Sequence, residues 1–190
     1  FTCDTNDYTG DFGVNYGNVE FTSVADQGVP SSLGTATLGT GVITLGFGNS
    51  ATRLGYVGAG NSSTTRSLDW ANPTTGCILE ASGGGTIAYL ATGNLKSGSG
   101  SGFVRLDGTN TGTKTLNQII NDNGGVTTVT KTNVGTWVLT GANNYSGDTT
   151  IQLGTLALSG SGTIGTSANL ILCSGATFDV SALSGAYNLS

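Results

Sequence analysis

Short runs of alternating apolar residues, broken by glycine, constrain the fold of this chain more than any other feature. Residues 135–165 read GTWVLTGANNYSGDTTIQLGTLALSGSGTIG. Trp137 and Leu139 would share one face of an extended segment, and the phase of the alternation changes at Gly154. Period-two runs that are rich in Thr, Val and Ile and are interrupted by Gly are typical of short strands separated by corners. This stretch therefore predicts strand, bend and strand.

The same pattern occurs one step upstream. The segment VRLDGTNTGTKTL at 104–116 aligns with VLTGANNYSGDTTI at 138–151 at offsets of 33 to 35 residues, and a weaker match falls near Leu172. Asn110 and Asn143 occupy equivalent places, which suggests corner residues whose side chains form a ladder along an axis. Recurrence at such a spacing indicates stacked supersecondary units.

The composition excludes several classes of protein. Only 9% of the 190 residues are charged and 33 are Gly, yet aliphatic alternation continues throughout, which is not typical of disordered chains. No apolar run is long enough to span a membrane. The net charge of −5 and the scattered cations argue against binding to nucleic acid or to an anionic membrane surface.

Two architectures fit many short strands: an antiparallel sandwich or barrel, and a parallel β-solenoid. The turn sequence NDNGG at 121–125 favours the former, whereas the self-similarity favours the latter. We predict an all-β solenoid over residues 34–190. Residues 1–33, which are acidic, aromatic and aperiodic, are expected to form an N-terminal cap or interaction segment.

The alternation also predicts which side chains point inward. The expected interior positions of the repeat, and the residues on which they should stack, are all aliphatic: Leu139, Ile151, Leu153, Leu156 and Leu158, stacked with Leu106, Leu116 and Leu172.

Three cysteines leave at least one unpaired. Cys77 and Cys173 are 96 residues apart, several coils of a solenoid, and this distance is too great for a disulfide. A Cys3–Cys77 disulfide remains open if the N-terminal segment folds back, and three small, mostly buried thiols are the alternative.

Residues for catalysis are scarce, because the chain has no His. β-Helices that cleave acidic polysaccharides use carboxylates grouped with Arg or Lys. The nearest such groups are Arg66 with Asp69 and Glu80, and Arg105 with Asp107, which serve equally well as surface ion pairs. We therefore predict no catalytic and no cofactor-binding residues.

Two further features have a functional and a structural interpretation. The acidic stretch at 4–11 offers oxygen ligands for Ca²⁺ but lacks the spacing of known calcium loops, so we predict no metal site. Trp70, Tyr89 and Tyr145 could stack on sugar rings, although aromatic residues at strand positions more often pack in the interior.

Residues 131–160 resemble a known family, the autotransporter-associated β-strand repeat, also called the passenger-associated transport repeat. The resemblance rests on the motif GTWVLTGANNYSGDTTIQLGTLAL at 135–158, which matches the family pattern almost throughout. It implies a right-handed parallel β-helix outside the cell, in the passenger region of a surface or secreted protein of a Gram-negative bacterium.

The expected function is therefore that of a non-catalytic extracellular β-solenoid, a structural or adhesive module of a bacterial surface protein or fibre. Its expected partner is a neighbouring solenoid segment or further copies of itself, associated head to tail, with surface glycans as a further candidate ligand. No nucleic acid, membrane insertion or cofactor is expected. The alternative is a carbohydrate-active β-helix, either a polysaccharide lyase or a hydrolase.

Overall fold

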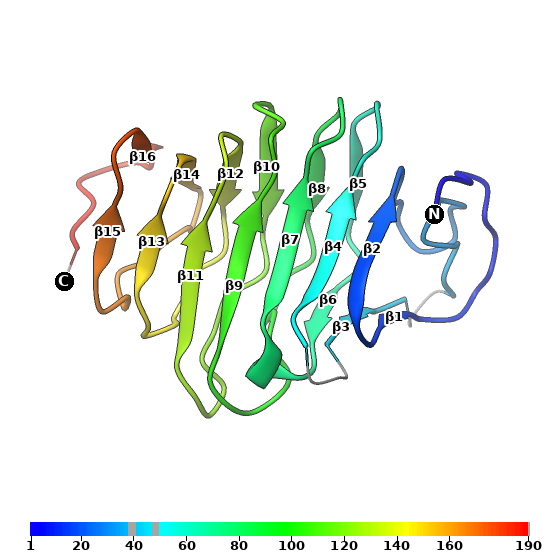
Figure 1. Ribbon diagram of the computed structural model, residues 1–190, viewed down its shortest axis with the longest axis horizontal. Helices are drawn as coiled ribbons and strands as arrows, with labels where there is room; N and C mark the ends of the chain where they lie inside the picture. The colour runs from blue at the N-terminus through cyan, green and yellow to red at the C-terminus, as the bar shows by residue number, and fades with distance from the viewer. Residues whose placement is uncertain (38–40, 47–49, 190) are drawn as a thin grey trace.

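The chain folds into stacked coils whose strands all pair in parallel. The structure, a computed structural model, describes residues 1–37, 41–46 and 50–189. Within these residues sixteen strands form three sheets that run along one axis, and the two termini lie at opposite ends (Figure 1). The only helical element in the described part of the chain is a short 3-10 turn, η1 (Pro73–Thr75). The predicted parallel β-helix is confirmed.

The two long sheets take one strand from nearly every coil, whereas the three-stranded sheet takes strands only from the first three coils. The three-stranded sheet contains β1 (Phe12–Val14), β3 (Ile43–Leu45) and β6 (Leu68–Trp70). The seven-stranded sheet contains, in spatial order, β2 (Gly17–Phe21), β4 (Thr52–Tyr56), β7 (Cys77–Ala81), β9 (Gly102–Asp107), β11 (Thr127–Lys131), β13 (Thr149–Ile151) and β15 (Leu170–Leu172). The six-stranded sheet contains β5 (Ser62–Thr64), β8 (Ile87–Tyr89), β10 (Thr113–Leu116), β12 (Thr136–Leu139), β14 (Gly154–Ser159) and β16 (Ala176–Ala182).

The strand register defines the length of a coil. One interior column of the seven-stranded sheet runs through Leu54, Leu79, Leu106, Lys131, Ile151 and Leu172, whose successive members are 20 to 27 residues apart. The self-similarity at 33 to 35 residues is therefore not the length of a coil. It relates Leu106 to Leu139, which lies in the other long sheet and stacks on Leu116.

Four of the five predicted inward residues of the repeat are buried with no exposed surface: Leu139, Ile151, Leu156 and Leu158. The prediction for Leu153 is wrong, since 38% of this residue is exposed. Leu153 lies at the corner between β13 and β14, immediately before Gly154, whose φ of 72° turns the chain. Strand alternation therefore stops at Ile151.

Side-chain amides complete the third side of the solenoid beyond β6. The Leu68 amide donates to Gln118 Oε1 (2.8 Å), and Gln118 Nε2 donates back to the Leu68 carbonyl (2.9 Å), so a buried Gln replaces a strand. Asn143 acts similarly one coil further on, accepting from the Ile120 amide (2.8 Å) and donating to the Thr163 carbonyl (3.0 Å). These contacts satisfy buried backbone groups on a side where backbone pairing is reduced to isolated parallel bridges.

The expected asparagine ladder takes a different form. Asn110 Nδ2 donates to the Gly83 carbonyl and to the Gly85 carbonyl (2.9 Å), both on the preceding coil. Asn143 bonds with a different corner, as described above. Each Asn therefore joins neighbouring coils, but it does so through the backbone of those coils rather than through the other Asn.

All three lysines lie inside the solenoid. Lys96, Lys114 and Lys131 are at most 1% exposed, and each ammonium group donates to backbone carbonyls at a corner. For Lys131 the acceptors are the carbonyls of Thr132 (2.5 Å), Asn133 (2.6 Å) and Leu153 (3.1 Å). Because Leu153 lies on the next coil, this lysine ties two successive corners together.

The N-terminal residues cover the first coil. Backbone amides of Thr22, Thr35 and Thr37 donate to the carbonyls of Phe1 (3.3 Å), Tyr8 (2.9 Å) and Thr9 (2.9 Å). Residues 1–33 also contain β1 and β2, which pair with β3 and β4. The segment that the sequence sets apart thus supplies strands to the first coil as well as a covering for it.

Candidate functional site

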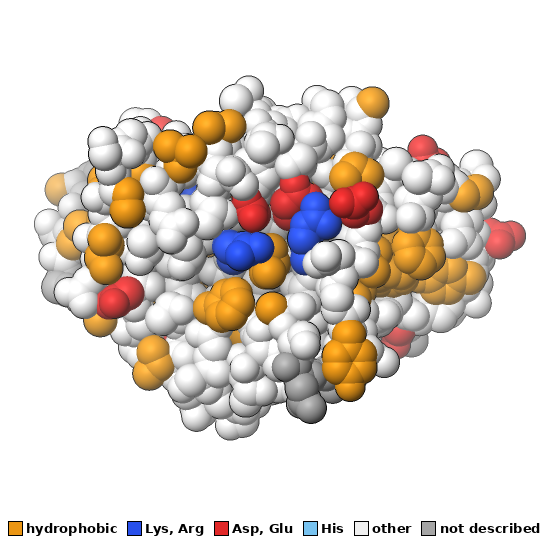
Figure 2. Space-filling model, in the orientation of Figure 1, with side chains coloured by type: hydrophobic (Ala, Val, Ile, Leu, Met, Phe, Trp, Pro, Cys, Tyr) orange, Lys and Arg blue, Asp and Glu red, His pale blue; other side chains and the backbone are white. Residues whose placement is uncertain are grey.

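Five charged side chains gather on the outer face of the seven-stranded sheet, and we call them the charged patch: Glu20, Arg53, Glu80, Arg105 and Asp107. They lie on four adjacent strands, β2, β4, β7 and β9. Figure 2 shows their red and blue atoms together near the middle of this face. The register explains the grouping, because Glu80 is directly opposite Asp107 on one side and Gly55 on the other.

Arg53 is held between two carboxylates. Its Nη1 lies 3.2 Å from Glu20 Oε1 and its Nη2 lies 2.6 Å from Glu80 Oε2. The guanidinium passes over Gly55, where a Cβ atom would stand only 2.9 Å from Arg53 Cζ. Glu80 also accepts a hydrogen bond from Ser82 Oγ. The absence of a side chain at Gly55 therefore makes room for an ion pair that links three coils.

Asp107 is fixed by its neighbours in the same way. Its Oδ1 accepts from Asn133 Nδ2 (2.6 Å) and from the Gly108 amide (2.7 Å), and Arg105 Nε lies 3.4 Å from Oδ2. Burial by itself would raise the pKa of Asp107, but the hydrogen bonds and the nearby guanidinium outweigh it and hold that pKa below its ordinary value.

The structure brings together only part of the carboxylate and cation set that the sequence singles out. Glu80, Arg105 and Asp107 share one face, as described. Arg66 is fully buried and donates to the carbonyls of Gly41 and Leu33, both at 2.9 Å, and Asp69 lies on β6 in a different sheet. A carboxyl group that acts as an acid or base catalyst needs a pKa raised toward the operating pH, whereas the pKa of Asp107 is lowered.

The three aromatic residues considered for sugar stacking are not available for it. Trp70, Tyr89 and Tyr145 have no exposed surface, so the packing interpretation is the correct one. Phe103, which the sequence reasoning missed, is at an outward position of β9 and is partly exposed. The alternation of Phe103, Arg105 and Asp107 in FVRLD is the signal that places all three on one face.

Two carboxylates of the acidic N-terminal stretch accept hydrogen bonds from other segments of the chain. Asp4 accepts from Thr22 Oγ1 (2.5 Å) and Ser23 Oγ (2.7 Å), and Asp11 accepts from the Gly41 amide (2.7 Å). These two carboxylates thus bond to different segments. Within the described ranges, no three side chains of the Cys, Asp or Glu type lie close enough together to hold a metal ion.

All three cysteines are free thiols, so the Cys3–Cys77 disulfide that the sequence leaves open does not form. Cys77 is buried in the interior, and burial raises the pKa of its thiol to about 12. Cys3 and Cys173 are exposed, so the expectation of mostly buried thiols holds only for Cys77.

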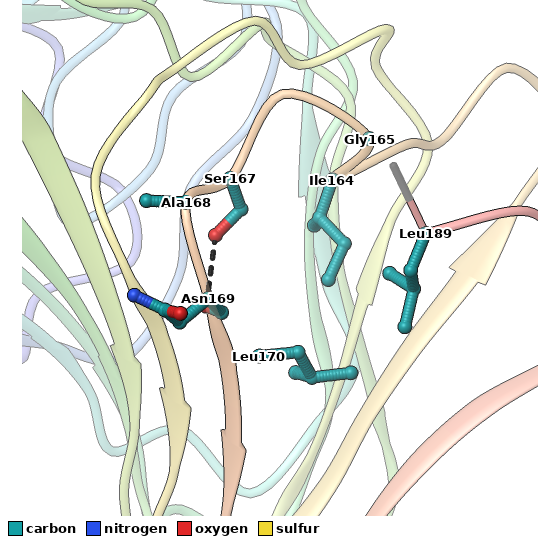
Figure 3. A pocket seen from close by; sticks show the side chains of 7 residues that line it. All are labelled: Ile164, Gly165, Ser167, Ala168, Asn169, Leu170 and Leu189. Atoms are coloured by element: carbon teal, nitrogen blue, oxygen red, sulfur yellow. Dashed lines mark hydrogen bonds between the residues drawn. The ribbon is translucent and has the colours of Figure 1, made fainter.

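The C-terminal end of the solenoid is partly open. β15 and β16 are the outermost strands of their sheets, and Leu172, in register with the buried Ile151, is 49% exposed. A cavity of about 250 Å³ lies beside them, with Ile164, Leu170 and Leu189 on its walls (Figure 3). Tyr187 covers part of this end, its hydroxyl accepting from the Ile164 amide at 2.6 Å.

Stacked parallel coils with aliphatic interior columns and a self-paired polar surface define the chain as a β-helical repeat protein. Residues 129–158 match the family model described as Passenger-associated-transport-repeat. The chain is 38% identical over 145 residues to the Adhesin BmaC autotransporter of Brucella suis biovar 1 (strain 1330), across 75% of this chain and 4% of that protein. No solved structure matches the chain. The predicted resemblance is thus confirmed: residues 129–158 match the passenger-associated transport repeat, and 75% of the chain is similar to an autotransporter adhesin. In the part of the chain that the structure describes, no helix is long and apolar enough to cross a membrane.

Proposed function

We propose that this chain is a non-catalytic extracellular β-solenoid segment that serves a bacterial surface protein as a structural and adhesive module. The stack of parallel coils supports a structural role, because it presents its outer faces along a single rod (Figure 1). The adhesive part of the proposal draws on the similarity to an autotransporter adhesin, of which this chain spans 4%.

The open C-terminal end carries the proposal that the module associates end to end. The edge strands β15 and β16 have unpaired backbone groups on one side, and the interior column ends in the exposed Leu172. Edges of this kind pair with another strand unless they are covered. The opposite end is covered by residues 1–9, so a following parallel coil is a better occupant of the open end than a second copy.

The contacts within the charged patch support a lack of catalysis rather than the alternative function, polysaccharide cleavage. Glu80 and Asp107 are both engaged by guanidinium groups and by hydrogen bonds. We expect no lyase or hydrolase turnover of acidic or neutral polysaccharides, measured by reducing-end release and by absorbance of unsaturated products. Turnover that disappears in Glu80→Gln would contradict this expectation.

Adhesion is tested by displaying the chain on a non-adherent bacterial host. We expect several-fold more bound bacteria on cultured epithelial cells than for the same host displaying an unrelated β-solenoid at equal density. Soluble folded chain, added in excess, should compete the binding away, whereas unfolded chain should not. Binding no higher than that of the control host would overturn the adhesive role.

A further inference from the structure

A group of outward side chains on β9 and β11, which we call the platform, overlaps the charged patch at Arg105 and Asp107. The outward residues of β9 are Phe103, Arg105 and Asp107, and the register sets Thr128 opposite Phe103 and Thr130 opposite Arg105. Because the strands of a sheet lie about 4.8 Å apart, each hydroxyl is close to the side chain it faces. The platform thus combines one aromatic ring, two hydroxyls, a guanidinium and a carboxylate.

The Phe103 ring packs closely against the backbone at Gly76. Gly76 lies beneath, and a Cβ atom there would stand 2.3 Å from Phe103 Cζ, so any other residue at this position would push the ring away. Gly76 also has a φ of 85°, which favours glycine for a second reason. The ring is supported by the backbone on one side and is partly open to solvent at an outward strand position.

Arg105 retains unused hydrogen-bond donors. Its side chain is 38% exposed, and its Nε lies in an ion pair 3.4 Å from Asp107 Oδ2 yet forms no hydrogen bond, although the atom is buried. A guanidinium has five N–H donors in a fixed plane. A ligand with oxygen acceptors beside the Phe103 ring would therefore meet the terminal N–H groups of this partly exposed guanidinium rather than its buried Nε.

The charges of the patch indicate which ligand fits. Three carboxylates and two guanidiniums leave a net charge of only −1, and the strongest contacts are made among themselves. A surface of this kind offers little attraction to a polyanion or a polycation, because electrostatic complementarity requires an excess of one sign. A neutral molecule with apolar faces and many hydroxyls suits it better.

From this geometry we propose that the platform binds a neutral glycan, with one sugar ring stacked on Phe103 and its hydroxyls hydrogen-bonded by Arg105, Asp107 and Thr130. The proposal rests on the adhesive role proposed above and names the chemical class of its ligand. Aromatic rings contribute large contact areas at low entropic cost, and polar groups around them fix the orientation of the ligand.

The experiment is a titration of the isotope-labelled 190-residue chain, followed by NMR, with lacto-N-tetraose and maltopentaose as neutral probes and 3′-sialyllactose as an anionic comparator. We expect shifts confined to residues of β7, β9 and β11 with at least one neutral probe. Phe103→Ala should weaken that binding at least about tenfold. Phe103→Trp should retain it, because an indole ring also stacks, and Arg105→Gln should weaken it.

Thr150→Ala provides the matched control, since Thr150 is an outward residue of β13 in the same row as Arg105 but two strands away. This variant should bind as the unaltered chain does. Shifts with neither neutral probe, binding that Phe103→Ala leaves unchanged in a folded chain, or salt-sensitive binding of 3′-sialyllactose only would overturn the proposal. Cell adhesion without glycan binding would refute this inference alone, and glycan binding without cell adhesion would refute the adhesive role alone.

Discussion

Two of the buried lysines of this protein, Lys114 and Lys131, occupy places where the neighbouring coils carry an apolar residue. Lys131 lies between Leu106 and Ile151 in one column, and Lys114 is opposite Trp137 in another. Their alkyl stems extend that packing, and their ammonium groups bond with corner carbonyls. Burial lowers the pKa of both ammonium groups to about 8, and for Lys131 the nearby Lys114 adds to the effect.

A pH-dependent stability follows from these pKa values. In the unfolded chain a Lys keeps its proton up to about pH 10.4. Between pH 8 and that value the unfolded state therefore holds more protons than the folded state, so both lysines make the free energy of unfolding rise with pH. Cys77 acts in the opposite direction above about pH 8.5, because its pKa is raised on folding.

The measurement is therefore a comparison of the chain with its Lys114→Met, Lys131→Met double variant, in which Cys77 contributes equally. Urea unfolding from about pH 7.5 to pH 10 should show the stability of the natural chain improving relative to the variant as the pH rises. A difference between the two that stays constant over this range would mean that the ammonium groups titrate normally inside the fold.

At the scale of the strands, the sequence predicts much of the arrangement because alternation is a local property. Leu139, Ile151, Leu156 and Leu158 could be placed inside from their spacing alone. Leu153 could not, since the turn at Gly154 takes it out of the strand. The charged patch could not be predicted from the sequence either. Arg53, Glu80 and Asp107 come together only because successive coils are 25 and 27 residues long, and no local sequence pattern encodes those lengths.

The repeat offers a matched pair of truncations. Leu156→Ala removes a fully buried side chain between Trp137 and Phe178 on the adjacent strands, and it should cost roughly 2 to 5 kcal/mol of unfolding free energy. Leu153→Ala, three residues away and 38% exposed, should cost less than about 1 kcal/mol. Both values come from urea denaturation, and equal costs for the two variants would show that the inward face is assigned incorrectly.

On the scale of the whole molecule, the two ends differ. Residues 1–9 bond with the backbone of Thr22, Thr35 and Thr37, whereas β15 and β16 present open edges. Removing residues 1–9 should leave the first coil uncovered, so that the open end of one molecule can pair with the first coil of the next. We expect the shortened chain to associate with rising concentration in sedimentation velocity, while the full chain remains largely monomeric.

Leu172→Lys in the shortened chain supplies the control, because a charge at the exposed end of the interior column should prevent that association. Circular dichroism establishes that both shortened chains fold. If the folded, shortened chain stays monomeric at high concentration, then residues 1–9 do not block pairing and end-to-end association loses its support.

The direction of the hydrogen bonds has a mechanical consequence. The strands of successive coils lie side by side along the long axis (Figure 1), so the bonds between coils point along that axis. Tension applied between the ends acts on all the boundaries between coils in series, so the weakest boundary yields first and the coils should separate singly. Each coil holds 20 to 27 residues and so releases roughly 70 to 100 Å of extended chain in place of a rise of about 4.8 Å. Under load the rod lengthens in discrete steps and dissipates force, as an extensible tether does.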